Sequence, residues 1–379
     1  MTTRDNTRPL TIAVTGLNAT DNPGPGVAVI RALREHPALS GCRIVGLAYD
    51  VLEPGIYSDG LTDALFMLPY PSQGREALME RLEYIHDRLG GLDVIIPTLD
   101  AELPSFIDLS DRLAAMGVGT YLPTARQFEL RSKARLDDLG RLANIRVPEG
   151  RVIQTAAELA DLDDAIPLPF VVKGPYYGAK VVYSRPEAVA AFHRFAAEWG
   201  IPIIAQRMVQ GQELNVLAVG DGVGALLGAV AMKKTFITDK GKGWAGVTIR
   251  DPELMAITER FMEATSWRGP CELEIIRDAD GDYHLIEVNP RLPAWCYLSA
   301  GAGMNLPATV ALLALGHEVA PTRDYRAGTM FVRIAIDQIA HVSDMAALTT
   351  LGEKPSAAVG FQPVASASEA APQPEGDRS

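Results

Sequence analysis

Apolar runs alternate with amphipathic stretches over the first part of the chain, and this pattern predicts strands that alternate with helices. Residues 10–17 (LTIAVTGL) form a short apolar run typical of a buried parallel strand, and residues 27–36 have the spacing of a helix. A second strand is expected at 43–49, an amphipathic helix at 76–90 and a third strand at 93–97. This alternation predicts an α/β unit with a parallel, doubly wound sheet and right-handed crossovers.

Two polar loops follow strands of this predicted sheet, at the edge where doubly wound sheets bind ligands. The loop at 18–26 contains NPGPG. Its backbone amides could hold a substrate carboxylate at the start of the next helix, or could simply close a tight strand–helix turn. In the other loop, Asp100 and Glu102 either stabilise the N-terminus of a helix or receive a substrate amine. The residues alone leave both alternatives open.

From about residue 124 the chain changes character, because short apolar strands separated by polar turns replace the earlier alternation. Strands are expected at 170–173 and 203–209, and another begins at Glu213. Lys173 closes the first of these strands, where a charge in an apolar setting is costly unless an anion meets it. The pattern therefore predicts an α+β unit with cationic side chains at strand ends.

The chain is accordingly divided into a first unit at residues 1–123 and a second unit at residues 124–362. Residues 363–379 are rich in Ala, Pro, Ser and Glu, and this composition predicts a disordered tail. A length of 379 residues agrees with two or three compact units. No internal repeat is visible, so a single catalytic unit is expected.

The most informative segment is residues 271–291, CELEIIRDADGDYHLIEVNPR, which predicts two strands joined by a tight Asp-Gly turn. A hairpin sets the far ends of its strands side by side, so Glu274 and Glu287 are expected to meet, with Asn289 on the same face. Two carboxylates and an amide oxygen form a hard, all-oxygen site suited to Mg²⁺ or Mn²⁺ that carries nucleotide phosphates. Arg291 would add a fixed positive charge. The alternative is a surface hairpin that merely carries acidic residues.

This segment resembles the metal-binding signature of the ATP-grasp superfamily, in which Glu274 is followed by E-V-N-P-R at 287–291. With VTGLNATDNPGPG and VIIPTLDAEL ahead of it, the chain is similar to carbamoyl-phosphate-synthetase-like ligases. The resemblance implies a pre-ATP-grasp domain at 1–123 and a two-lobed ATP-grasp fold at 124–362, with a flexible lid at about 150–212. It also implies that ATP phosphorylates a carboxylate and that a nucleophile then attacks the acyl phosphate.

The resemblance further implies which residues contact the nucleotide. Lys173 stands before the turn at 174–178, which matches a phosphate lid but has only two glycines where relatives have more. Gln206 stands where the family usually has a glutamate, and its amide oxygen can accept from the adenine amino group. The backbone around Arg207 and Val209 would bracket the adenine edge. Glu213 would contact the ribose hydroxyls, and Lys133 would be the second lysine that contacts the nucleotide.

Three basic residues are assigned to the chemistry. Lys234 ends an apolar strand, and together with Lys173 it would orient the γ-phosphate towards an in-line carboxylate. Arg291 would stabilise the acyl phosphate and the oxyanion that forms when an amine attacks. The loop at 239–244 would cover the substrate, and Trp295 would either line the acceptor pocket or fill the core.

Charge and composition narrow the range of partners. A net charge of −12 argues against a nucleic-acid partner, whose phosphates demand a basic face. Three cysteines, Cys42, Cys271 and Cys296, are too few and too scattered for a disulfide framework or a zinc site. The chain shows neither an apolar signal segment at its start nor an apolar run approaching the length of a membrane span. A cytoplasmic protein without a membrane partner is therefore expected.

The first hypothesis is an ATP-dependent carboxylate–amine ligase that joins small-molecule or peptide substrates and releases ADP and phosphate, with ATP and Mg²⁺ or Mn²⁺ as cofactors. The second is a carbamoyl-phosphate-synthetase-like carboxylate kinase with ammonia or water as the acceptor. The third, from another class, is a nucleotide-binding regulatory protein without turnover. The resemblance is also compatible with a homodimer. No pattern identifies the carboxylate or the amine.

Overall fold

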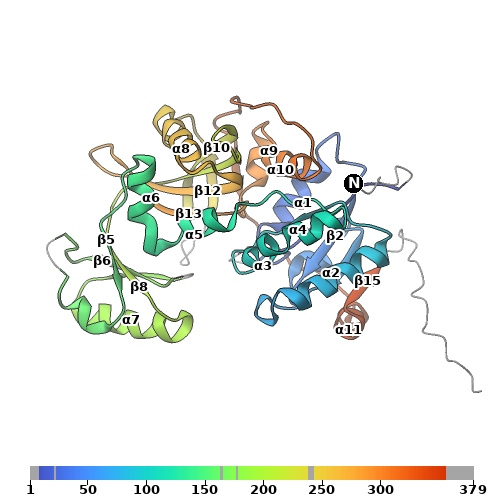
Figure 1. Ribbon diagram of the computed structural model, residues 1–379, viewed down its shortest axis with the longest axis horizontal. Helices are drawn as coiled ribbons and strands as arrows, with labels where there is room; N and C mark the ends of the chain where they lie inside the picture. The colour runs from blue at the N-terminus through green and yellow to red at the C-terminus, as the bar shows by residue number, and fades with distance from the viewer. Residues whose placement is uncertain (1–7, 21–22, 163–164, 176–177, 238–242, 356–379) are drawn as a thin grey trace, which may run out of the picture.

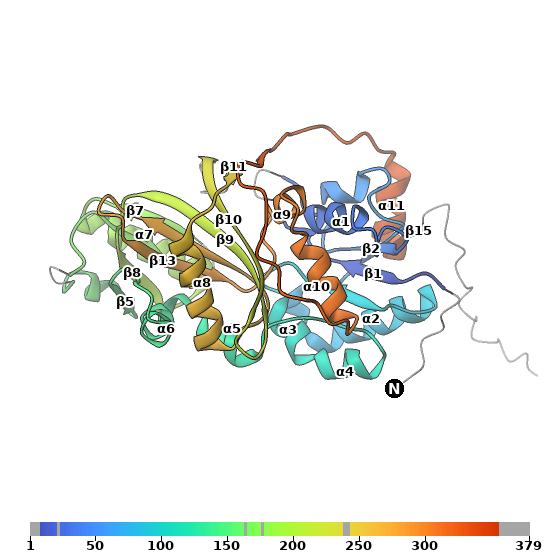
Figure 2. The same cartoon turned by 90° about the horizontal axis from the view of Figure 1, so that it is seen from above.

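The computed structural model describes residues 8–20, 23–162, 165–175, 178–237 and 243–355. The predicted tail at 363–379 lies outside these residues, as do the middle of the lid turn and most of the predicted substrate loop. Figures 1 and 2 show three parts: an N-terminal unit at one end, a lid lobe at the other end and a central unit between them.

The N-terminal unit is built on a five-stranded sheet in the order β15-β3-β2-β1-β4. Its parallel strands are β1 (Thr11–Val14), β2 (Arg43–Ala48), β3 (Ala64–Met67) and β4 (Val94–Ile96). Helix α1 (Gly26–Arg34) covers one face and α2 (Arg75–Leu89) covers the other, because their apolar side chains belong to different hydrophobic clusters. The predicted doubly wound sheet is therefore present.

Two strands of this sheet were not predicted from the sequence. Strand β3 is four residues long, and a run that short shows no period. Strand β15 (Glu353–Pro355) follows α11 (Val342–Leu351) and pairs antiparallel with β3. Arg88 of α2 holds this strand through an ion pair of 3.1 Å to Glu353. Residues 342–355 thus pack with the first unit, although the predicted boundary assigned them to the second, and we place them in the N-terminal unit.

The central unit is a six-stranded antiparallel sheet in the order β13-β12-β9-β10-β11-β14. Its strands are β9 (Gln212–Asp221), β10 (Leu226–Ile237), β11 (Gly243–Thr248), β12 (Arg268–Arg277), β13 (Tyr283–Asn289) and β14 (Met330–Val332). Helices α6 (Leu136–Ala143) and α8 (Pro252–Thr265) share a hydrophobic cluster with one face of this sheet. Apolar residues of the other face pack against the N-terminal unit.

The lid is a four-stranded antiparallel sheet in the order β5-β8-β6-β7, packed on helix α7 (Arg185–Trp199) (Figure 1). Its strands are β5 (Gly150–Ile153), β6 (Phe170–Lys173), β7 (Ala179–Val182) and β8 (Ile203–Arg207). The hydrophobic cluster of the lid contains only residues between 153 and 205, so the lid has a core of its own. A lobe with its own core can move as a body about its connections, and that motion stays a prediction.

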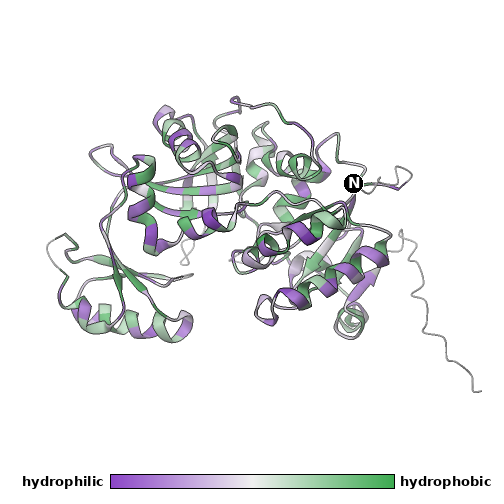
Figure 3. Ribbon diagram, in the orientation of Figure 1, coloured by the Kyte–Doolittle hydropathy of each residue, from purple (hydrophilic) through white to green (hydrophobic). Residues whose placement is uncertain are grey.

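Short helices fill the junction between the N-terminal and central units. Helix α10 contributes to the same hydrophobic cluster as β1 and β9, which joins the two units into one packed body. The remaining helices and 3₁₀ turns are α3 (Leu103–Asp108), α4 (Ser110–Ala115), α5 (Ala125–Leu130), α9 (Tyr297–Gly301), α10 (Leu306–Ala314), η1 (Pro54–Tyr57), η2 (Pro71–Gln73), η3 (Lys133–Arg135) and η4 (Ala156–Leu159). Figure 3 shows the strands mostly hydrophobic and the helices banded. No helix within the described residues has the length and hydropathy to span a bilayer.

The glycine-containing loop after β1 is a tight strand–helix turn. The backbone N–H of Gly26 donates to the carbonyl of Gly16 at 3.0 Å, and that of Gly24 donates to the carbonyl of Asn18 at 2.7 Å. A Cβ atom on Gly26 would lie 2.1 Å from the carbonyl oxygen of Thr15, which only glycine avoids. These amides are engaged within the loop, so the described residues favour the close turn over the substrate carboxylate site.

Candidate active site

Two carboxylates face one another across the β12–β13 hairpin. Glu274 is directly opposite Glu287 in the strand register, and Glu272 is directly opposite Asn289. Residues that oppose each other in an antiparallel pair lie on the same face, as do residues two apart in one strand. The strand pairing therefore brings together the three residues that the sequence assigned to a metal, and it adds Glu272 beside them.

Glu272 is a buried carboxylate that the sequence analysis missed. It is 5% exposed, and its Oε1 accepts from Asn215 Nδ2 at 2.7 Å and from Trp295 Nε1 at 2.6 Å. Its Oε2 accepts from Asn289 Nδ2 at 3.0 Å. Burial raises its pKa and the charge of Glu274 raises it further, but three N–H donors on two oxygens are the partners that an ionised carboxylate needs. Its alternation with Glu274 was the signal available in the sequence.

Trp295 lies in the core and also donates a hydrogen bond to Glu272. It is 7% exposed and belongs to the hydrophobic cluster between the N-terminal and central units. Its indole N–H donates to Glu272 and is not directed into a solvent-facing pocket. Of the two interpretations left by the sequence, the structure supports the core position.

Lys234 of β10 lies between two carboxylates of the site. Its Nζ is 2.9 Å from Oε2 of Glu213 and 3.6 Å from Oε2 of Glu274. Burial by itself lowers the pKa of Lys234, but the attraction of Glu274 and Glu213 outweighs it and leaves the pKa above its ordinary value. The structure thus brings the predicted phosphate lysine and the predicted ribose glutamate into contact, with the lysine fully charged.

Two further lysines surround Glu287. The Nζ of Lys133, in η3, is 3.3 Å from Oε1 of Glu287. Lys173 ends β6, is 7% exposed and donates to the carbonyl of Ile286 at 3.3 Å. Burial lowers the pKa of Lys173 to about 8, with Glu287 opposing this shift and Lys133 adding to it. A buried lysine beside a carboxylate and a second lysine is well suited to meet an anionic ligand.

The predicted adenine hinge connects the lid to the central sheet. Gln206 is buried in β8, where it pairs with Gly150 of β5 and Val171 of β6. Arg207 is about half exposed and forms an ion pair of 3.2 Å with Glu149. The hinge backbone therefore emerges from the middle of the lid sheet, and the strand expected at 203–209 ends at Arg207.

A cavity of about 440 Å³ lies beside this hinge. It is lined by residues 207–210, which include Val209, and by Asp278 and His284 of the hairpin. The Nε2 of His284 is 2.7 Å from Asp278, whereas its Nδ1 is buried without a hydrogen-bond partner among the described residues. His284 was assigned nothing from the sequence, because a single histidine in a strand carries no pattern of its own.

Arg291 is directed towards the N-terminal unit. Its Nε donates to Oδ2 of Asp100 at 2.6 Å, and its Nη2 donates to Oδ1 of Asn289 at 3.4 Å. The sequence offered two roles for Asp100, a helix dipole partner or a receiver of a substrate amine. The structure instead pairs Asp100 with the arginine that the sequence assigned to the acyl phosphate.

Glu102 has a structural role. It is fully buried and accepts hydrogen bonds from the hydroxyls of Thr15 and Tyr49 and from the backbone N–H groups of Thr98 and Leu99. Burial raises the pKa of its carboxyl, while these four donors lower it. Glu102 is therefore committed to the strand–loop junction after β4 and does not face a substrate amine.

The donor set fits a magnesium ion that shares its coordination with phosphates. Within the described residues, no group of three or more His, Cys, Asp or Glu side chains could hold a metal unaided. Mg²⁺, however, needs only one or two protein carboxylates beside phosphates and water, and Glu274 and Glu287 supply two. Asn215 lies opposite Glu274, and its Oδ1 is buried without a partner in the part of the chain described. A bound cation would give that oxygen a partner.

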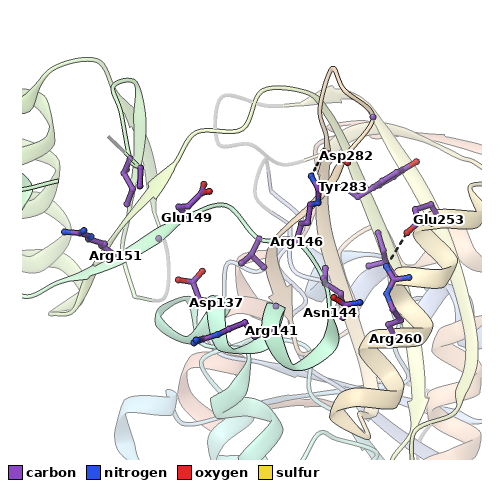
Figure 4. Close-up of a pocket in the computed structure, with 18 residues that line it drawn as sticks. Asp137, Arg141, Asn144, Arg146, Glu149, Arg151, Glu253, Arg260, Asp282 and Tyr283 are labelled. Carbon is purple, nitrogen blue, oxygen red and sulfur yellow. Dashed lines mark hydrogen bonds and ion pairs between the residues drawn. The ribbon is translucent and has the colours of Figure 1, made fainter. Parts of the chain in front are cut away.

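A larger cavity, of about 950 Å³, is lined by residues other than these carboxylates (Figure 4). Its lining comes from α6, β5, α8 and the hairpin turn, and it contains none of the predicted site residues. Arg146 pairs there with Asp282, and Arg260 pairs with Glu253 at 3.3 Å. Two other charges of the lining, Arg141 and Glu149, pair with Asp138 and Arg207 outside it. Because the cavity holds none of the predicted site residues, the hairpin face remains the candidate active site.

Comparison with known proteins agrees with this arrangement. Residues 201–335 match a family model described as ATP-grasp in the biosynthetic pathway with Ter operon. A curated relative, D-alanine–D-alanine ligase from Chromohalobacter salexigens, is 29% identical over 171 residues, which cover 41% of this chain and 54% of the relative. The chain thus spans about half the length of the curated relatives that it matches.

Two solved structures resemble the whole arrangement. Biotin carboxylase from Campylobacter jejuni, in a β,γ-ATP complex, aligns with a TM-score of 0.63 at 16% identity, over 82% of this chain and 71% of that one. L-amino acid ligase from Bacillus licheniformis aligns with a TM-score of 0.58 at 17% identity, over 82% of this chain and 75% of that one. These likenesses confirm the expected ATP-grasp fold.

Proposed function

We propose that this chain is an ATP-dependent carboxylate–amine ligase that works through an acyl phosphate and releases ADP and phosphate. The observation that carries the proposal is the meeting of Glu274 and Glu287 on one sheet face, with Lys133, Lys173 and Lys234 around them. Carboxylates and lysines in contact form a site that can receive a metal ion and a polyphosphate together.

The ion pairs at this site prepare it for a magnesium–nucleotide complex. Lys133 pairs with Glu287, and Lys234 pairs with Glu274. Glu274 and Glu287 would hold a magnesium ion, which supplies positive charge to the phosphates, and Lys133 and Lys234 would then be free to pair with phosphate oxygens. Every buried charge keeps an opposite charge beside it, so binding avoids the large cost of an unpaired buried ion.

The remaining residues support transfer of the γ-phosphate and attack by an amine. Lys173 and Lys234 would hold the γ-phosphate in line with the substrate carboxylate, which raises the effective concentration of the reacting groups. A magnesium ion on Glu274 and Glu287 would neutralise charge that builds on the phosphates. Arg291 would face the oxyanion that forms when the amine attacks the acyl phosphate.

The hinge and its cavity supply the place for the base and sugar. Residues 207–210 line the cavity of about 440 Å³, and Gln206 precedes them in the buried strand. Glu213 lies between this hinge and the carboxylate pair, because it is opposite Ile276 in the register. We therefore keep Gln206, Arg207 and Val209 as adenine contacts and Glu213 as the ribose contact.

The comparisons favour amino acids as the substrates to test first. Two proteins that this chain resembles are named as ligases of D-alanine and of L-amino acids. The rival carboxylate kinase and the regulatory protein without turnover are outcomes of the same assay. A homodimer and a cytoplasmic location stay predictions, and sedimentation velocity would measure the first.

The experiment measures ADP and phosphate release with Mg²⁺ over amino acids supplied singly and in pairs, with product masses read from the same wells. Release that needs two substrates and yields a condensed product supports the ligase. Release with one carboxylate and no condensed product supports the kinase. ATP binding without release from any pair supports the regulatory protein.

Two matched variants test whether the activity depends on the carboxylates of the hairpin. Glu287→Gln removes one metal carboxylate and should lower turnover by at least about a hundredfold. Glu198→Gln makes the same chemical change at an exposed position on α7 and should leave turnover unchanged. Equal activity of the two variants would place the chemistry elsewhere.

A further inference from the structure

Arg131 is a buried guanidinium without a hydrogen-bonded acid. It follows α5, its side chain is 9% exposed, and the guanidinium carbon lies 4.3 Å from the ring centroid of Phe128. Its nearest carboxylate oxygen is Oδ1 of Asp100, 3.9 Å from Nη1, which is too far for a hydrogen bond. Its Nε is fully buried and has no partner within the described residues.

This arrangement is unusual because buried donors are normally satisfied. A guanidinium has five N–H donors and never loses its charge in a protein, so leaving it unpaired in the interior is costly. Of the side-chain nitrogens of Arg131, only Nε is both fully buried and unpartnered, so Nη1 and Nη2 keep the remaining access to solvent. The planar end of the side chain is therefore open to a ligand from outside.

Asp100 is hydrogen-bonded to Arg291 and not to Arg131. It is the carboxylate nearest to Arg131 among the described residues, and its other oxygen accepts from Nε of Arg291 at 2.6 Å. An anion that reached Arg131 would supply the acceptors that its guanidinium lacks within the described residues.

Arg131, Asp100 and Arg291 form a cluster that lies beside the proposed site of reaction. Arg291 follows Asn289 at the end of β13, and its Nη2 reaches Oδ1 of Asn289 at 3.4 Å. Asp100 follows β4 of the N-terminal unit, and Arg131 follows α5. The cluster therefore lies at the end of the hairpin face opposite the hinge, where the junction of two units meets the place proposed for the acyl phosphate.

We propose that Arg131 binds a non-reacting carboxylate of the substrate pair, so that at least one substrate is an amino acid or peptide with a free carboxylate beyond the reacting group. The planar fork of arginine matches a carboxylate through two parallel hydrogen bonds. This inference rests on the proposed ligase function and adds a substrate class to it. The bound carboxylate takes the open side of the guanidinium, and Asp100 continues to hold Arg291.

The test compares substrates that have or lack that carboxylate. Turnover is measured with MgATP and one acid as the carboxylate donor, while the amine partner is L-alanine, D-alanine or glycylglycine or the C-terminal amide of each. Amidation then removes only a carboxylate that does not react. Binding of the same probes in the presence of MgADP is measured by ligand-observed NMR, which needs no turnover. We expect the acids to bind and the amides to bind at least about tenfold more weakly, because an amide leaves the charged guanidinium unpaired.

Variants of Arg131 identify the residue responsible. Arg131→Gln should raise the KM for the acid about 10- to 100-fold, change kcat little and leave the KM for ATP unchanged. Arg131→Lys keeps the charge without the fork and should fall between wild type and Gln. Arg141→Gln removes an exposed arginine paired with Asp138 and is the matched control. Urea unfolding of each variant separates a folding defect from a lost contact.

Several results would overturn the inference while leaving the ligase proposal intact. Acids and amides that bind and react alike would show that no carboxylate is read. A raised KM for ATP in Arg131→Gln would assign the guanidinium to a nucleotide phosphate instead. If NMR showed that the wild-type protein binds the nucleotide but none of the acids, the subsite would also be refuted. Loss of nucleotide binding in the wild-type protein would count against the ligase proposal itself.

Discussion

The side-chain amide of Asn289 is held by the carboxylate of Glu272, with 3.0 Å between Nδ2 and Oε2. The same Nδ2 lies 2.9 Å from Oε1 of Glu274, so both of its hydrogens are directed at carboxylates. The amide oxygen therefore faces the other way, where Nη2 of Arg291 lies 3.4 Å from it. Glu272 thus decides which end of Asn289 is offered to the surroundings of the candidate metal site.

Glu272→Gln should weaken the use of metal. A glutamine offers an NH₂ group to three N–H donors, so Asn289 would turn its oxygen inward to accept from it and lose its orientation. Changes to groups that orient metal ligands typically cost about 10- to 100-fold in metal affinity or activity. The measurement is the Mg²⁺ concentration that gives half-maximal ADP release, together with Mn²⁺ binding by electron paramagnetic resonance.

The comparison for this variant is Trp295, whose indole N–H donates to Glu272 from outside the hairpin. Trp295→Phe removes one donor and leaves the link between Glu272 and Asn289 in place, so it should change the Mg²⁺ requirement less than Glu272→Gln. Equal Mg²⁺ titrations for wild type and Glu272→Gln would show that the carboxylate does not orient the metal site.

Removal of divalent metal should abolish the stabilisation that ATP gives the protein. Without a cation, Glu274 and Glu287 keep their lysines, and phosphates must compete with those ion pairs. We expect ATP with Mg²⁺ to raise the melting temperature by several degrees and ATP with EDTA to raise it much less. A shift of the same size under both conditions would mean that the carboxylates do not act through a metal.

Binding of metal-free ATP should weaken as the pH rises through about 8. Burial lowers the pKa of Lys173 from 10.5 to about 8, so the free lysine is charged below that pH and neutral above it. Phosphate prefers the charged form, and affinity should fall by up to about tenfold per pH unit above 8. Calorimetric titration between pH 7 and 9.5 measures this.

A variant with arginine at position 173 provides the control for that titration. Lys173→Arg keeps a charge throughout the range, so its affinity for metal-free ATP should not change with pH. The stability of the folded state should change in the opposite sense, because the unfolded chain holds this proton up to the ordinary pKa. Lys173 therefore makes the folded protein relatively more stable as the pH rises from about 8 to 10.5.

Glu102→Ala should destabilise the N-terminal unit by about 3 kcal/mol, because four buried donors lose their acceptor at once. Urea unfolding measures the change in free energy. Asp108→Asn, at an exposed carboxylate paired with Arg75, should stay within about 0.5 kcal/mol of wild type. A small effect of Glu102→Ala would mean that water satisfies those donors.

The three thiols should be unreactive in the folded protein. Cys42, Cys271 and Cys296 are buried and form no disulfide, and burial raises the pKa of Cys271 and Cys296 well above its usual range. Since the thiolate is the reactive species, Ellman's reagent should titrate almost no thiol in buffer and three in guanidinium chloride. Rapid reaction of one thiol in buffer would show that its site opens.

Local sequence patterns predicted much of this protein's structure. The Asp-Gly turn between two alternating strands was enough to predict that Glu274 and Glu287 meet, because the register of a short hairpin follows from its turn. The same alternation would have found Glu272, had its spacing from Glu274 been weighed. The parallel sheet and the strand position of Lys173 likewise followed from short-range hydrophobic pattern.

Other contacts join residues that are far apart in the sequence, and nothing local specifies them. Arg291 meets Asp100 across 191 positions, and β15 joins β3 after the whole central unit has been completed. The sequence by itself therefore determined many of the elements, the hairpin and the types of charge at the site. The tertiary structure decided which charges are paired and buried, because burial and pairing depend on how separate units pack together.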